Sequence, residues 1–305
     1  MKVTVLPVPG PGAEDVVVAD NGLVYTGTAD GHVVAVRPDG GGAERVAHTG
    51  GRPLGLELLP DGRLLVCDAH NGLLALDPRD GELETLAFEV DGIPMAFCNN
   101  AAVASNGDIW FSDSSTVFGI EKWKNDFVQD TRTGRLLRLR DGRVETVLEG
   151  LAFANGVALA ADESYVAVAE TAARTVVRHW LTGEKAGQRD LLCADLPGYP
   201  DNIARGSDGL IWVTIASPRD PLVERLQRAP MPVRKAVTAI PEALQPKAKR
   251  TVRAMAFADD GTCVHDISGE AGGYHMVTGV REHDGKLWLG SLEEPAVAVI
   301  DLRDV

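Results

Sequence analysis

The chain has 305 residues, a net charge of −14 at neutral pH and a hydrophobic content of 45%. A chain of this length buries about three quarters of its unfolded surface on folding, so it needs no disulfides for stability. The negative charge argues against nucleic acid as a main partner, because phosphate binding needs a basic face. With 33 glycines and 5% aromatic residues, the composition favours many tight turns over long helices.

Cysteine usage and the first residues favour a reduced, cytoplasmic compartment. The four cysteines are widely separated and form no Cys-x-x-Cys pair, so neither a zinc site nor a disulfide framework is expected. Residues 1–7 lack the apolar core of a signal peptide, and no apolar run reaches membrane-spanning length. We therefore expect a cytoplasmic protein without a transmembrane segment.

Six repeated units follow one another, each marked by a hairpin turn. The turns fall at residues 21–22, 61–62, 106–107, 162–163, 208–209 and 284–285, and five of the six are Asn-Gly or Asp-Gly. Apolar runs flank each turn, and a second pair of runs often follows, as at residues 72–77 and 83–88. Four strands per unit at this spacing are typical of propellers. We predict an all-β fold in which residues 1–305 form a single six-bladed β-propeller domain.

Two segments lie outside this repeat. Residues 3–8 belong to no unit, and we expect them to pair with the strand at residues 297–301 and close the ring. Residues 218–250 predict short helices inserted into the fifth blade, with eight basic and three acidic residues. They form either a solvated surface insertion or a lid or docking face at one mouth of the channel. The irregular residues 114–133 are expected to line the same mouth.

One position in each unit carries the candidate site. It lies seven residues before the first turn residue, near the start of the strand that lines the channel of a propeller. In chain order the position holds Glu14, Leu54, Asn99, Asn155, Asp201 and Val277. Turn chemistry does not explain the four oxygen-bearing side chains, since the turns lie downstream. Two carboxylates and two amide oxygens suit Ca²⁺ better than Mg²⁺, and zinc would favour His or Cys ligands.

Three neighbouring residues extend the candidate site into the expected substrate pocket, together with Leu54, Phe97 and Val277. Asn100 and Asn202 each follow a position of the set directly, and either support the metal ligands or are ordinary polar strand residues. His275 lies two residues before Val277, and either reaches the channel mouth or is a hydrogen-bonded rim histidine. The chain has no Gly-x-Ser-x-Gly and no His-Glu-x-x-His motif, so serine-nucleophile and zincin chemistry are not expected.

Three segments resemble the strictosidine-synthase-like proteins, which are grouped with the SMP-30/gluconolactonase and paraoxonase-like six-bladed propellers. These segments are Gly-Arg-Pro-Leu-Gly-Leu at 51–56, Phe-Ala-Asn-Gly-Val-Ala-Leu at 153–159 and Leu-Pro-Gly-Tyr-Pro-Asp-Asn-Ile at 196–203. The resemblance covers essentially the whole chain. It implies that Glu14, Asn155 and Asp201 hold a catalytic divalent metal, with Asn99 beside them.

The chain departs from these relatives at three positions. Strictosidine synthases carry a glutamate base where this chain has Val277, and paraoxonases carry a histidine where it has Leu54. Sugar-lactone hydrolases have an arginine at the position of Phe97. The resemblance therefore implies a less polar lactone or ester as substrate, with Leu54, Phe97 and Val277 as an apolar wall.

We expect a Ca²⁺-dependent hydrolase that acts on lactones or on aryl or other carboxylic esters. The metal would polarise the carbonyl, and Asp201 would act as the general base. Two alternatives stay open. One is a non-catalytic propeller that binds a partner and holds a structural Ca²⁺. The other is an amine–aldehyde condensing enzyme, which Val277 disfavours.

Overall fold

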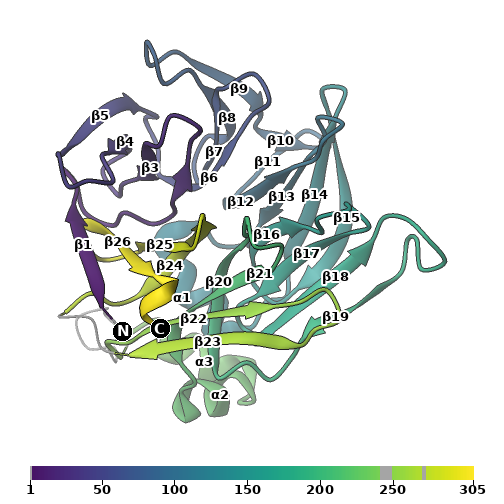
Figure 1. Ribbon diagram of the computed structural model, residues 1–305. Helices are drawn as coiled ribbons and strands as arrows, with labels where there is room; N and C mark the ends of the chain where they lie inside the picture. The colour runs from purple at the N-terminus through teal and green to yellow at the C-terminus, as the bar shows by residue number, and fades with distance from the viewer. Residues whose placement is uncertain (1, 241–248, 270–272) are drawn as a thin grey trace.

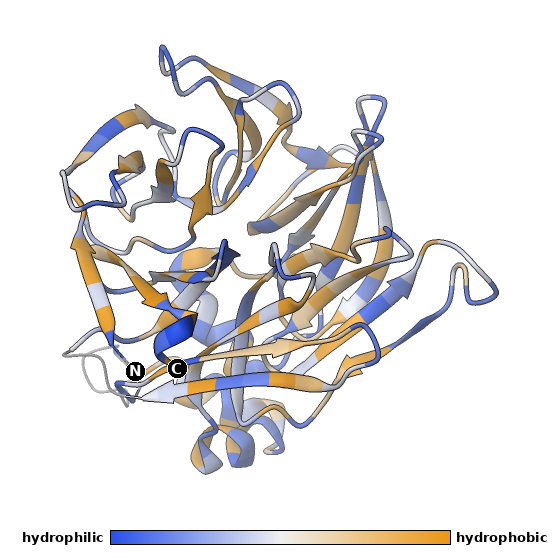
Figure 2. Cartoon of the chain, in the orientation of Figure 1, coloured by the Kyte–Doolittle hydropathy of each residue, from blue (hydrophilic) through white to orange (hydrophobic). Residues whose placement is uncertain are grey.

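The computed structural model describes residues 2–240, 249–269 and 273–305. Six four-stranded antiparallel sheets surround a central axis, so the predicted six-bladed propeller is confirmed (Figure 1). Figure 2 shows hydrophobic residues concentrated in the strands and hydrophilic residues in many of the connecting turns. The described part of the chain contains no helix long and apolar enough to cross a membrane.

In the first five blades the strands follow chain order from the axis outwards. The first three blades are β2 (Val17–Val18), β3 (Val24–Gly27), β4 (His32–Val36), β5 (Ala43–His48); β6 (Pro53–Leu58), β7 (Leu64–Asp68), β8 (Gly72–Leu76), β9 (Leu83–Ala87); and β12 (Cys98–Val103), β13 (Ile109–Asp113), β14 (Gly134–Arg140), β15 (Arg143–Leu151). The next two are β16 (Ala154–Leu159), β17 (Tyr165–Glu170), β18 (Thr175–Trp180), β19 (Arg189–Cys193); and β20 (Gly198–Arg205), β21 (Ile211–Pro218), β22 (Val252–Phe257), β23 (Cys263–Gly269). A small hairpin, β10 (Glu89–Val90) and β11 (Ile93–Pro94), links the second and third blades.

The sixth blade joins the two ends of the chain. It contains β24 (Val277–His283), β25 (Lys286–Ser291), β26 (Ala296–Asp301) and, as its outer strand, β1 (Val3–Pro7). β1 pairs antiparallel with β26, with Val3 opposite Ile300 and Pro7 opposite Ala296. This confirms the predicted ring closure. The short helix η3 (Leu302–Asp304) follows β26.

Apolar contacts between neighbouring blades form the core. One cluster joins the fourth and fifth blades through residues such as Tyr165 and Ile211, and another joins the fifth and sixth through Trp212 and Leu289. Equivalent clusters lie between the other neighbouring pairs of blades. Six close-packed interfaces of this kind hold the blades of the propeller rigidly, so residues near its central axis have fixed positions.

The expected helical insertion lies between β21 and β22 of the fifth blade and contains α2 (Pro221–Gln227) and α3 (Met231–Thr238). The Asp220 side chain caps α2 by accepting a hydrogen bond from the Leu222 N–H at 2.8 Å. The insertion packs on α1 (Trp123–Gln129), which follows η1 (Ile120–Lys122) in the irregular segment after β13. Gln129 contacts α3 through a hydrogen bond from Nε2 to the Thr238 hydroxyl at 2.9 Å. Residues 241–248 of the predicted insertion lie outside the described residues.

Candidate metal and substrate site

A β-bulge interrupts the innermost strand at the same place in five blades. At each bulge two residues of the inner strand oppose one residue of its neighbour, at positions 54–55, 99–100, 155–156, 201–202 and 278–279. In the first blade, where the ladder starts later, Glu14 takes the equivalent place and donates a backbone hydrogen bond to Gly27 at 3.1 Å. Bulges break the alternation of side chains and re-aim them, so two successive residues can face the axis.

The strand register places the ring residue of the sixth blade one position later than the spacing from the turn predicts. Five hairpins have wider turns, whereas the sixth is a two-residue turn in which His283 pairs directly with Lys286. Asp284 and Gly285 of that turn both have positive φ, at 50° and 73°, as a tight primed turn requires. The shorter turn moves the equivalent residue from Val277 to Thr278. The axial ring is therefore Glu14, Leu54, Asn99, Asn155, Asp201 and Thr278, and we correct the expected place of Val277 accordingly.

The four ring residues predicted as metal ligands each present a buried oxygen that has no hydrogen-bond partner. These atoms are Glu14 Oε2, Asn99 Oδ1, Asn155 Oδ1 and Asp201 Oδ1. An unpaired buried acceptor costs about 1–3 kcal/mol, so four of them in one ring need an explanation. A hard divalent cation, which takes carboxylate and amide oxygens, would satisfy all four.

Hydrogen bonds from the two amides fix the direction of their oxygens. Asn99 Nδ2 donates to the Ser114 hydroxyl at 2.9 Å, and Ser114 donates in turn to the Ala154 carbonyl at 2.6 Å. Asn155 Nδ2 donates to the Thr171 hydroxyl at 3.1 Å. Each amide nitrogen is thus occupied, which leaves the amide oxygen as the free end.

The electrostatics of the ring also fit a cation. Burial raises the pKa of Glu14 from 4.5 to about 7, although the Arg52 guanidinium opposes the rise. Burial and then the charge of Glu14 raise the pKa of Asp201 well above its usual range, while a hydrogen bond from Asn155 opposes this. Two carboxylates buried close together resist being ionised at once, and a bound dication would remove that resistance.

The described residues contain no group of three or more His, Cys, Asp and Glu side chains placed to hold a metal ion. The axial ring contains only two residues of those types, Glu14 and Asp201, because its other two oxygen donors are the amides of Asn99 and Asn155. Its donor set therefore fits a hard cation such as Ca²⁺ and not a soft metal.

The residues that directly follow the ring positions form a second layer around the axis, in which polar residues alternate with glycine. The residues after the ring positions are Asp15, Gly55, Asn100, Gly156, Asn202 and Gly279. A Cβ on any of these glycines would come within 2.1–2.6 Å of backbone atoms of the next blade, so only glycine fits. This close approach brings the polar residues of alternate blades together around the axis.

Asn100, which we expected at the pocket, connects three blades in this layer. Its Nδ2 donates to Asp15 Oδ2 at 3.1 Å, and its Oδ1 accepts from the Val157 N–H at 2.9 Å. Asn202 is buried in the same layer, and neither side-chain polar atom has a partner. The structure therefore places both asparagines in this buried layer, each directly after a ring position.

An apolar wall stands on one side of the ring. Leu54 and Phe97, both predicted to line the pocket, are fully buried in one cluster with Phe153. The Phe97 and Phe153 rings meet edge to face at 5.5 Å between centroids. Trp123 of the α1 region packs against this cluster, so the irregular segment 114–133 comes next to the ring position Leu54.

His275 and Val277 lie outside the axial ring. Nδ1 of His275 contacts Glu294, its Nε2 lies 3.0 Å from Glu293, and these two carboxylates occupy both ring nitrogens. Val277 is fully buried in the core between the fifth and sixth blades. The histidine is thus hydrogen-bonded to carboxylates, as in the second of the two interpretations that the sequence left open.

Two residues of the site had no role assigned from the sequence. Arg52 lies 3.6 Å from Glu14 Oε2, and its side chain is only 13% exposed. Burial raises the pKa of Asp15 to about 6, with the nearby Arg281 opposing. Asp15 directly follows a ring position and could have been recognised once the bulge was known. Arg52 precedes a ring position by two residues, and no repeat of arginine at that place marks it in the other units.

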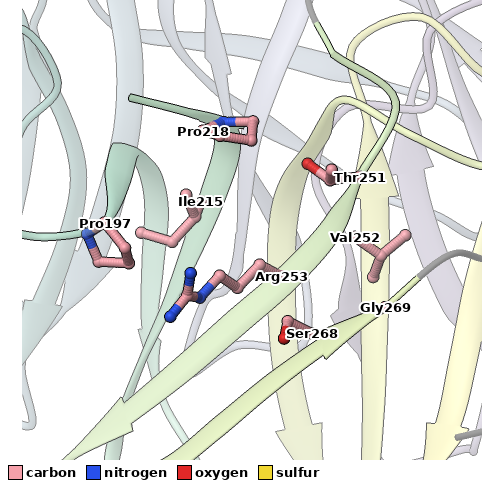
Figure 3. Close-up of a pocket in the computed structure, with 8 residues that line it drawn as sticks. All are labelled: Pro197, Ile215, Pro218, Thr251, Val252, Arg253, Ser268 and Gly269. Carbon is pink, nitrogen blue, oxygen red and sulfur yellow. The ribbon is translucent and has the colours of Figure 1, made fainter. Parts of the chain in front are cut away.

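Two cavities lie away from the axis. One, of about 250 Å³, lies in the fifth blade between residues such as Ile215, Arg253 and Ser268 (Figure 3). The other, of about 340 Å³, lies between the third and fourth blades beside Trp110 and Trp180. No ring residue lines either cavity, and the buried, unpaired oxygens of the axis make that ring the stronger candidate site.

Comparison with known proteins agrees with this architecture. Residues 13–239 match the SMP-30/Gluconolactonase/LRE-like region. The chain is 33% identical to Arabidopsis thaliana strictosidine synthase-like protein 10, over 91% of this chain and 82% of that protein. It is 32% identical to the adipocyte plasma membrane-associated protein of Salmo salar, over 93% of this chain and 74% of that protein.

Solved structures with low sequence identity share the fold. A gluconolactonase from Xanthomonas campestris superposes with a TM-score of 0.70 at 15% identity, over 97% of this chain and 88% of that chain. A calcium-binding regucalcin from Agrobacterium tumefaciens gives 0.67 at 12% identity, over 96% and 90%. From the match over most of its length, this chain belongs to the SMP-30/gluconolactonase/LRE-like family.

Proposed function

We propose that this protein is a Ca²⁺-dependent hydrolase of lactones or carboxylic esters, with its active site at the axial ring. The observation that carries the proposal is the set of four buried, unpartnered oxygens from Glu14, Asn99, Asn155 and Asp201. The shared fold with a gluconolactonase and a calcium-binding regucalcin supports both the reaction class and the metal.

The ring residues have separate roles in the reaction. Glu14, Asn99, Asn155 and Asp201 would hold the cation, which supplies the Lewis acidity that polarises the substrate carbonyl. Asp201 accepts a proton from the attacking water, whose oxygen forms a new bond to the carbonyl carbon. The bond to the alkoxy oxygen breaks, and that oxygen takes up a proton to leave as the alcohol. With a lactone the product is a single hydroxy acid.

The apolar wall sets the kind of substrate. Leu54, Phe97 and Phe153 present no hydrogen-bonding side-chain group, so a sugar lactone would leave its hydroxyls unpaired against them. An aryl or alkyl ester, or an alkyl lactone, matches this surface better. At the sixth ring position Thr278 donates its hydroxyl to the Glu14 carbonyl at 2.8 Å, so it supplies no base for amine–aldehyde condensation.

Hydrolysis of phenyl acetate and of dihydrocoumarin by demetallated and Ca²⁺-reconstituted protein tests the proposal. We expect turnover only with Ca²⁺, and a loss of about 100-fold or more in kcat/KM for Asp201→Asn. Asp266→Asn is the matched control, because Asp266 pairs with Arg253 on an exposed strand far from the axis. Turnover that survives exhaustive chelation, or full activity of Asp201→Asn, contradicts the mechanism. A Ca²⁺-induced rise in Tm without turnover of any ester supports the non-catalytic, calcium-binding alternative.

A further inference from the structure

Arg52 has an unusual position for a buried arginine. It directly precedes β6, two residues before Leu54 of the axial ring. Its closest carboxylate oxygen, Glu14 Oε2, is 3.6 Å from Nη2, which is longer than a hydrogen bond. Nε of Arg52 is buried and has no partner. Within the described residues the Arg52 side chain donates no hydrogen bond.

Other arginines of similar exposure are anchored differently. Five have side chains that are 11–17% exposed, and each donates at least one hydrogen bond to a carboxylate or a carbonyl: Arg135, Arg174, Arg178, Arg205 and Arg281. Burying a guanidinium without such partners is unfavourable, so they show what a structural role requires here. Arg52 does not meet that requirement.

The charge of Arg52 becomes uncompensated when the ring binds a cation. The two ring carboxylates, Glu14 and Asp201, balance the charge of a dication. Glu14 then cannot also neutralise Arg52, and Glu121, whose carboxylate also interacts with the charge of Arg52, is 67% exposed and pairs with His70 at 2.6 Å. The loaded site would therefore carry one net positive charge at Arg52, which favours a monoanionic ligand.

The surroundings of Arg52 limit the form of that ligand. Leu54, two residues away, starts the apolar wall that continues to Phe97 and Phe153. A complementary ligand combines an apolar body for the wall with one anionic group for Arg52.

We propose that Arg52 is a specificity-determining residue that binds a free carboxylate on the substrate. On this basis the physiological substrate is an apolar lactone or ester that carries a carboxylate separate from the scissile bond. The inference rests on the proposed hydrolase function for the reaction, but the carboxylate contact itself does not depend on turnover.

Matched substrates test this assignment. Phenyl hydrogen glutarate and phenyl pentanoate have acyl chains of the same length, and only the first carries a carboxylate. We expect Arg52→Met to raise KM for phenyl hydrogen glutarate about tenfold or more, with less than about a twofold change for phenyl pentanoate. Arg52→Lys, which keeps the charge, should recover part of the loss. Equal effects on both substrates would overturn the proposal.

A binding measurement separates this inference from the proposed reaction. 4-Phenylbutyrate contains no ester, so its calorimetric titration into Ca²⁺-loaded protein reports the carboxylate contact alone. We expect Arg52→Met to weaken its binding about tenfold or more while Ca²⁺ affinity is retained or increased, since a neighbouring positive charge is lost. If neither ester is hydrolysed but 4-phenylbutyrate binding depends on Arg52, the proposed reaction fails and the carboxylate site stands. Unchanged 4-phenylbutyrate binding in Arg52→Met refutes the carboxylate site.

Discussion

The stability of the metal-free protein should depend on pH through Glu14. Burial raises the pKa of this carboxyl from 4.5 to about 7, with Arg52 opposing and Asp15 contributing to the rise. The folded protein then binds the proton more tightly than the unfolded chain does. The stabilisation is fully present below the unfolded pKa and is lost as the pH rises through the folded pKa. At about 1.4 kcal/mol per pKa unit, Glu14 alone accounts for a loss of about 3 kcal/mol.

Urea unfolding of demetallated protein at pH 5 and pH 8, followed by tryptophan fluorescence, measures this loss. We expect the free energy of unfolding to be lower at pH 8 by about 2–3 kcal/mol through Glu14, because pH 5 lies slightly above the unfolded pKa and most of the stabilisation is still present there. Asp15, whose pKa burial raises to about 6, adds to the loss in the same direction. Added Ca²⁺ should restore stability at pH 8 much more than at pH 5, because it binds the ionised carboxylates.

The variant Glu14→Gln is the control, because it removes the titrating group and keeps the shape of the side chain. It should show a clearly smaller difference in stability between the two pH values. Equal stability of the wild type at pH 5 and pH 8, or an undiminished difference in Glu14→Gln, would refute the assignment of a buried, protonated carboxyl to the metal-free ring.

Three further predictions concern the ring and its support. Thr171→Val removes the hydroxyl that holds the Asn155 amide, and should weaken Ca²⁺ binding about tenfold by calorimetry; unchanged affinity contradicts the role of that anchor. Gly156→Ala places a Cβ 2.1 Å from the backbone nitrogen of Ile203 and should lower the free energy of unfolding by about 3 kcal/mol in chemical denaturation. The control Gly119→Ala, whose Cβ would meet its nearest atom at 3.2 Å, should change the free energy of unfolding much less. Similar stabilities of these two variants would contradict the close packing. Deletion of residues 1–7 exposes the edge of β26 and should lower Tm and cause self-association on size exclusion; a monomer of unchanged Tm contradicts the closure.

Much of the fold could be predicted because hairpin turns have a strong local signature. The side chains of Asn21, Asp61 and Asp208 each accept a hydrogen bond from the N–H two residues on, so the turn chemistry is contained within a few residues. Equal spacing from these turns then placed Glu14 and Asp201 on equivalent strands. The strand pairing of residues 3–8 also followed from pattern alone.

The parts that the sequence did not reveal depend on tertiary packing. Neighbouring blades approach closely at two bulge residues, Gly55 and Gly156, and no local pattern reports the distance between blades. The two-residue turn at Asp284 shifted the sixth ring position from Val277 to Thr278, which spacing from the turn alone could not show. The significance of Arg52 is visible only when its distances to the ring and to other carboxylates are known.

The proposed function depends most on one feature, a divalent cation held in the axial ring by two carboxylate and two amide oxygens. Crystals of the protein soaked in Mn²⁺, an anomalous substitute for Ca²⁺, test it most directly. We predict an anomalous difference peak on the axis within coordination distance of Glu14, Asn99, Asn155 and Asp201, which is lost in Asp201→Asn. An empty ring in the wild-type crystal, or a peak only at other carboxylates, would contradict it.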